Sequence, residues 1–146
     1  MLAELALHAL TPATPLARRF GLLREGVALW SRGLRQRKAW EPHQARCRAI
    51  IAEVAASMPR RRKVVVLGSG PARDIPLDVL CASFDEVVLV DIVHLPLLRL
   101  KLWRQAKVSL LSRDLTGAMA PLEYPRDKLQ VLLLLEADDD VTIAAA

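Results

Sequence analysis

Residues 64–76 decide the fold, and they read VVVLGSGPARDIP. Four consecutive apolar residues, three of them β-branched valines, predict a strand that is covered on both faces in a parallel sheet. Gly68, Ser69 and Gly70 follow directly and predict a turn, because glycine readily adopts positive φ and can bring bare backbone N–H groups close to a ligand. A helix is expected to open near Pro76. The stretch therefore predicts a nucleotide-type ligand at the carboxyl end of a first strand.

The rest of the chain after residue 76 repeats the alternation of helix and strand. We expect a helix over 76–84, a strand over 87–90, a helix over 95–105, a strand over 108–111 and an apolar fourth strand over 129–135. An acidic segment and a tail of small residues follow. Alternating helices and fully apolar strands indicate an α/β fold with a parallel, Rossmann-like sheet of about four strands and right-handed crossovers.

The first 63 residues have a helical pattern and a different charge. We expect a short helix over 1–10, a longer amphipathic helix from Leu16, and another with Pro42 in its first turn that ends near Pro59. Residues 1–63 carry a net charge of +9 and residues 64–146 one of −4, within the total of +5. We divide the chain into a basic helical extension (1–63) and a Rossmann-like nucleotide-binding region (64–146), which together form one domain.

Asp91 is the first candidate for a specific role. It closes the second expected strand, 21 positions after Gly70. In nucleotide-binding βαβ units, an acid at about this spacing accepts hydrogen bonds from ribose hydroxyls. The alternative is a strand-end aspartate that caps the next helix. The last small position of a dinucleotide fingerprint would hold Arg73 here, which argues against a pyrophosphate cradle.

Three segments together resemble the first half of a class I S-adenosylmethionine-dependent methyltransferase: VVVLGSGPARDIP, EVVLVDIVHL and VSLLSRDLTG. The resemblance covers roughly residues 40–135. It implies that Gly68, Ser69 and Gly70 support the methionine and ribose end of S-adenosylmethionine. It also implies that Asp91 binds the ribose hydroxyls and that Asp114 contacts the adenine amino group.

The chain departs from this family in three places. Val66 stands where the family often has an acid, and Ala72 replaces its third loop glycine. After the expected fourth strand come acidic and small residues, without an Asn/Asp-Pro-Pro-Tyr motif. We therefore expect a domain truncated after that strand, which transfers no methyl group alone and self-associates or needs a partner protein. No catalytic residue can be named.

Two other functions stay open. One is a nicotinamide-dependent oxidoreductase, and the other is a non-catalytic domain that binds a partner or RNA through its basic helices. For the arginines of residues 18–62 we favour a solvated helix face over a nucleic-acid surface. The three histidines have no metal-like spacing, and the acids at 138–140 are expected to be a solvated tail, so we predict no metal site.

The two cysteines and the apolar runs bear on the compartment. Cys47 and Cys81 lie far apart without a CxxC pairing, which favours buried thiols over a zinc site or a disulfide framework. No apolar run reaches the length of a membrane span, and the N-terminus makes a poor signal peptide. We expect a cytoplasmic protein that does not bind membranes.

Overall fold

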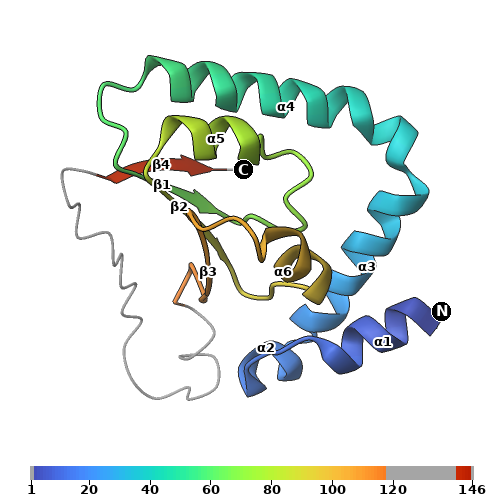
Figure 1. Cartoon of the computed structure of the whole chain (residues 1–146). Coiled ribbons are helices and arrows are strands. Elements are labelled where there is room, and N and C mark those ends of the chain that lie inside the picture. The colour runs from blue at the N-terminus through green and yellow to red at the C-terminus, as the bar shows by residue number, and fades with distance from the viewer. Residues whose placement is uncertain (1, 118–140, 146) are drawn as a thin grey trace.

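The computed structural model describes residues 2–117 and 141–145. Its helices are α1 (Leu2–Leu10), α2 (Pro15–Arg19), α3 (Leu22–Arg35), α4 (Arg37–Ser57), α5 (Leu77–Ser83) and α6 (Pro96–Leu102). Its strands are β1 (Lys63–Leu67), β2 (Glu86–Asp91), β3 (Val108–Ser112) and β4 (Val141–Ala145). Figure 1 shows the helices grouped around a small sheet.

The strands form a parallel sheet, which confirms the predicted α/β class. Within the described residues their order is β3-β2-β1-β4. The central pair is aligned so that Val65 lies opposite Val88. The expected strand over 129–135 lies outside the described residues. Residues 141–145 were expected to be part of a tail, and this was wrong: they pair with β1 along its whole length.

Three helices cover one face of the sheet, and alternating strand residues point toward them. Val64 and Val66 of β1 lie beside Val87 and Leu89 of β2, and all four are buried. Because side chains alternate between the faces of a strand, these four share one face. They pack with residues of α4, α5, α6 and the loops in a single core: Ala55, Ala72, Ile75, Leu80, Phe84, Leu98 and Leu102.

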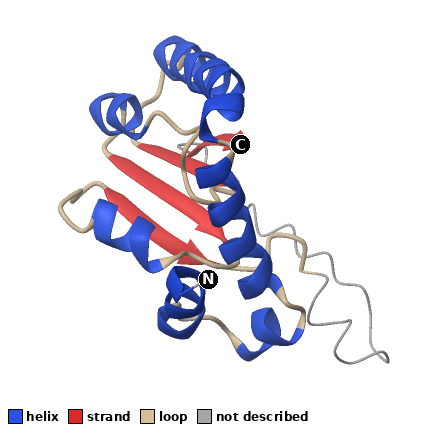
Figure 2. Cartoon of the chain, turned by 90° about the vertical axis from the view of Figure 1, so that its right-hand side faces the viewer, coloured by secondary structure: helices blue, strands red, loops and turns tan. Residues whose placement is uncertain are grey.

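A second, smaller core holds the first three helices against the segment that follows β2. Leu7, Ala17, Leu23 and Val27 pack there with residues that follow β2, namely Val93 and Leu95. In both views α3 crosses the end of the sheet at which the strands terminate (Figures 1 and 2). The N-terminal helices therefore form a wall beside the carboxyl edge of the sheet.

Two helix boundaries differ from the sequence prediction. The helix expected to run on from Leu16 is interrupted after α2, because Gly21 adopts a left-handed φ of 71° and starts α3 anew. Pro42 was expected in the first turn of a helix but lies inside α4, which begins at Arg37. None of the helices in residues 2–117 is both long and apolar enough to span a membrane.

Candidate site at the carboxyl edge of the sheet

The turn after β1 depends on three residues with positive φ. Gly68 has a φ of 73°, Gly70 one of 48° and Ala72 one of 52°. A Cβ built on either glycine would meet nothing within 4 Å. Glycine is therefore favoured at these two positions by the backbone conformation and not by lack of space, since the space beside the turn is open.

The N–H groups of this turn already have partners inside the protein. Gly68 and Ser69 both donate to the carbonyl of Val90, at 2.9 and 3.1 Å. The N–H of Gly70 donates to Oδ2 of Asp91 at 2.7 Å. The turn does not offer the bare N–H groups that we expected at these three positions. This is a poor arrangement for holding a phosphate, which binds best to several free N–H donors.

Asp91 lies where β2 ends and is held on both of its oxygens. Besides the bond from Gly70, Oδ1 accepts a hydrogen bond from the N–H of Ile92 at 2.6 Å. The residue is half-buried. An ionised carboxylate has about four acceptor positions, so two backbone bonds leave capacity for further donors. The carboxylate is thus fixed in orientation and still able to bind hydroxyl groups.

A cleft of about 330 Å³ opens directly beside Asp91 and Gly70. One face of α3 forms the opposite wall of the cleft. The residues of this face are Leu22, Glu25, Gly26, Leu29 and Arg32. These positions follow the three- and four-residue steps of one helical face. The cleft therefore joins the glycine turn, the strand-end acid and two charged side chains of the N-terminal extension.

His94 lies beneath this turn and is fully buried. Its Nδ1 is 3.1 Å from Oγ of Ser112 at the end of β3, and its Nε2 is 3.5 Å from Oγ of Ser69. Burial lowers the pKa of His94 below the ordinary value of 6.5, against the opposing charge of Asp91. Since hydroxyls both donate and accept, a neutral imidazole is satisfied in this position.

Asp114 lies beyond the end of β3 and is half-buried. Its Oδ1 accepts hydrogen bonds from the N–H and Oγ1 of Thr116, at 3.0 and 2.7 Å. It does not line the cleft beside Asp91. The structure thus brings together Gly68, Ser69, Gly70 and Asp91, and it leaves Asp114 at the neighbouring strand end.

Sequence reasoning missed three residues of this region. Arg32 was expected on a solvated helix face and Glu25 was given no role, although their spacing with Gly26 and Leu29 places both on one side of α3. His94 was given no role in the sequence analysis beyond its lack of metal-like spacing. Its neighbours Val93 and Leu95 are both buried, and an apolar residue on each side is the sequence signal that could have identified it.

The described residues contain no group of three or more histidine, cysteine, aspartate or glutamate side chains that could hold a metal ion. We assign no catalytic residue. Comparisons of the chain with models of known protein families, with curated proteins and with solved structures find no match.

Proposed function

We propose that the chain binds S-adenosylmethionine or S-adenosylhomocysteine in the cleft between the glycine turn and α3. The observation that carries the proposal is the position of Asp91, which lies at the cleft with both oxygens oriented by backbone N–H groups. A strand-end carboxylate in this position suits the two adjacent hydroxyls of a ribose. The cleft's volume of about 330 Å³ falls in the range of small-molecule sites.

The backbone at Ala72 also supports the resemblance to class I methyltransferases. Ala72 stands where that family has its third loop glycine, and it has a φ of 52°. A residue with a Cβ seldom adopts this conformation, which costs it on the order of 1–2 kcal/mol. The turn thus has a glycine-like backbone even where the glycine itself is missing.

The two charged side chains of α3 fit the amino-acid end of such a ligand. Arg32 can pair with a carboxylate and Glu25 with an ammonium group, and both line the cleft that Asp91 lines. A ligand whose ribose lies on Asp91 would then extend its methionine portion along α3. In this proposal the N-terminal extension contributes directly to ligand binding.

A nicotinamide dinucleotide is the less favoured ligand. Its pyrophosphate would need free N–H donors in the first turn. Those of Gly68, Ser69 and Gly70 are bonded to Val90 and Asp91 instead. An adenosyl ligand carries no phosphate and does not need them.

The proposal includes a protein partner, either a second copy or another chain. Large apolar side chains are exposed on and next to α6 and β3: Leu97, Leu100, Trp103, which directly follows α6, and Leu111. Leu97, Leu100 and Trp103 follow one another at three-residue steps, so each neighbours the next on the surface, and large exposed apolar patches are typical of interaction sites. Sedimentation of the purified chain tests this part, and a stable monomer would contradict self-association.

We also retain a cytoplasmic location, supported by Cys47 and Cys81, which form no disulfide.

Calorimetric titration of the purified chain tests the ligand. We expect S-adenosylhomocysteine and S-adenosylmethionine to bind in the titration. In a separate thermal-shift measurement both should raise the melting temperature of the protein, and NADH should do neither. Failure of both adenosyl ligands to bind would refute the proposal. Tight binding of NADH would instead support the oxidoreductase alternative.

A further inference from the structure

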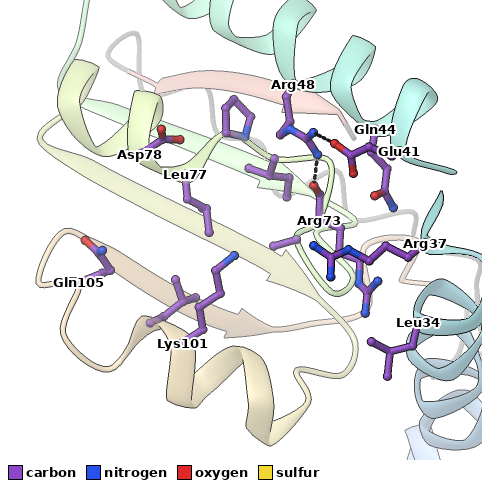
Figure 3. Close-up of a pocket in the computed structure, with 14 residues that line it drawn as sticks. Leu34, Arg37, Glu41, Gln44, Arg48, Arg73, Leu77, Asp78, Lys101 and Gln105 are labelled. Atoms are coloured by element: carbon purple, nitrogen blue, oxygen red, sulfur yellow. Dashed lines mark hydrogen bonds and ion pairs between the residues drawn. The ribbon is translucent and has the colours of Figure 1, made fainter.

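A second cleft, of about 580 Å³, lies on the other flank of the segment that follows the glycine turn. It is bounded by α4, α5 and α6 (Figure 3). Four cationic side chains from three separate parts of the chain line it: Arg37 and Arg48 of α4, Arg73 of the loop and Lys101 of α6. Two carboxylates, Glu41 and Asp78, also line it. Positive charge therefore predominates in this cleft.

Two of these cations are fixed by hydrogen bonds to the backbone. Arg48 donates from Nη1 to the carbonyl of Arg73 at 2.7 Å and pairs through Nη2 with Glu41 at 2.6 Å. The side chain of Arg73 in turn donates to the carbonyl of Gly33 at 2.7 Å. A Cβ on Gly33 would already lie 3.4 Å from the guanidinium of Arg73. The arginines thus tie the loop to α3 and α4 and stand in defined positions.

Arg48 and Arg73 retain N–H donors that are not used in these hydrogen bonds. A guanidinium has five N–H donors, and Arg48 and Arg73 spend only some of theirs on the contacts above. Arg37 and Lys101 form no ion pair within the described part of the chain. Of the two carboxylates, Glu41 is already neutralised by Arg48. The cleft therefore has an excess of cationic donors that converge from several sides (Figure 3).

We propose that this cleft binds the phosphate group of a small ligand. Guanidinium groups match the geometry of phosphate oxygens, and a lysine adds a mobile point charge. A small ligand is favoured over an extended polyanion, because Asp78 on the α5 wall, which no ion pair neutralises within the described residues, would repel a phosphate chain that ran through the cleft. The proposal does not rest on the adenosyl ligand, since Asp91 and Gly70 line a different cleft.

The test is a titration of the full chain with inorganic phosphate at constant ionic strength. Binding is monitored by NMR of the backbone amides. We expect saturable shifts at residues around Arg37, Arg48 and Arg73. Arg37→Gln and Lys101→Gln should each weaken phosphate binding by roughly three- to tenfold, because each removes a charge-assisted hydrogen bond. Both side chains are exposed and unpaired, so their replacement leaves the fold intact, which an unchanged melting temperature verifies.

Arg46→Gln is the matched control. Arg46 is exposed on the same helix as Arg37 and does not line the cleft, and the substitution changes the net charge equally. Equal weakening by Arg46→Gln would overturn the proposal in favour of a diffuse charge effect. So would the absence of saturable shifts. Tighter binding of a short oligonucleotide, weakened alike by all three substitutions, would instead establish an extended nucleic-acid surface.

Discussion

The backbone N–H of Gly70 donates to Oδ2 of Asp91 at 2.7 Å, and this bond joins the turn after β1 to the end of β2. The other oxygen of Asp91 is held by the N–H of Ile92. The carboxylate therefore fixes the shape of the glycine turn at the same time as it faces the cleft. A ligand that binds to Asp91 would meet an acceptor whose orientation is already set, which lowers the entropic cost of binding.

Replacement of Asp91 is predicted to weaken both ligand binding and the turn. Asp91→Ala should reduce the affinity for S-adenosylhomocysteine by roughly 1.5–3 kcal/mol, since charge-assisted hydrogen bonds to the ribose are lost. Asp91→Asn should restore little, because its amide oxygen can accept from only one of the two backbone N–H groups and its NH₂ group cannot accept from the other. Calorimetry measures the affinities. Asp85→Ala is the control: Asp85 is exposed just before β2 and should not change binding. An unchanged affinity in Asp91→Ala would refute the ribose role.

Asp114→Ala is predicted to have a smaller effect on the same affinity. Asp114 does not line the cleft, and its Oδ1 is engaged by Thr116. An adenine contact would be made at the edge of the site, where a hydrogen bond contributes on the order of 1 kcal/mol or less. Calorimetry on Asp91→Ala and Asp114→Ala shows directly which substitution costs more affinity. A loss larger than that of Asp91→Ala would mean that the ligand is centred on β3 instead of β2.

Much of the sheet could be predicted because buried parallel strands have a local signature. The expected strands over 64–67, 87–90 and 108–111 match β1, β2 and β3 within a residue or two at each end. For β1 and β2, a continuous apolar run that ends at a glycine or an acid is enough to identify the strand, whereas β3 contains Ser109 and is half-exposed to exposed along its length. The break at Gly21 was not predictable in the same way, since glycine occurs both inside helices and in left-handed turns.

The candidate site was harder to predict than the strands, because its geometry depends on backbone contacts between distant segments. Spacing alone placed Asp91 near Gly70. It could not show that the N–H groups of the turn are occupied by Val90 and Asp91. The contribution of α3 likewise depends on how that helix packs through Val27 against Val93, a contact between segments far apart in sequence.

His94 is predicted to make the protein less stable in acid. Burial lowers its pKa in the folded state below the 6.5 of the unfolded chain, so the unfolded state binds more protons between these two values. The free energy of unfolding should therefore fall as the pH drops below about 6.5, by at most about 1.4 kcal/mol per pH unit. Denaturant unfolding between pH 5 and 8 measures this slope. His94→Gln should flatten this slope. An equal slope in His94→Gln would show that other groups cause it.

Two glycines are predicted to respond to alanine in opposite directions. Gly68→Ala should lower the free energy of unfolding by about 1–2 kcal/mol, because its φ of 73° is unfavourable for a residue with a Cβ. Gly26→Ala should raise it by about 0.5–1 kcal/mol, because Gly26 lies inside α3 and a new Cβ would come no nearer than 4.0 Å to Val93. Urea unfolding of both variants measures the difference. A stabilised Gly68→Ala variant would contradict the left-handed turn.

The last prediction separates the two ends of the proposed ligand. Arg32 lines the cleft from α3 and is exposed, so its pairing with the carboxylate of the methionine portion should contribute about 0.5–1 kcal/mol. Arg32→Gln should therefore weaken S-adenosylhomocysteine roughly two- to fivefold and leave adenosine, which lacks that carboxylate, unchanged. Asp91→Ala should weaken both ligands, because both carry the ribose. Arg46→Gln controls for the loss of one positive charge. Equal weakening of adenosine by Arg32→Gln would place the nucleoside, and not the amino-acid end, against α3, and the orientation proposed for the ligand would then be reversed.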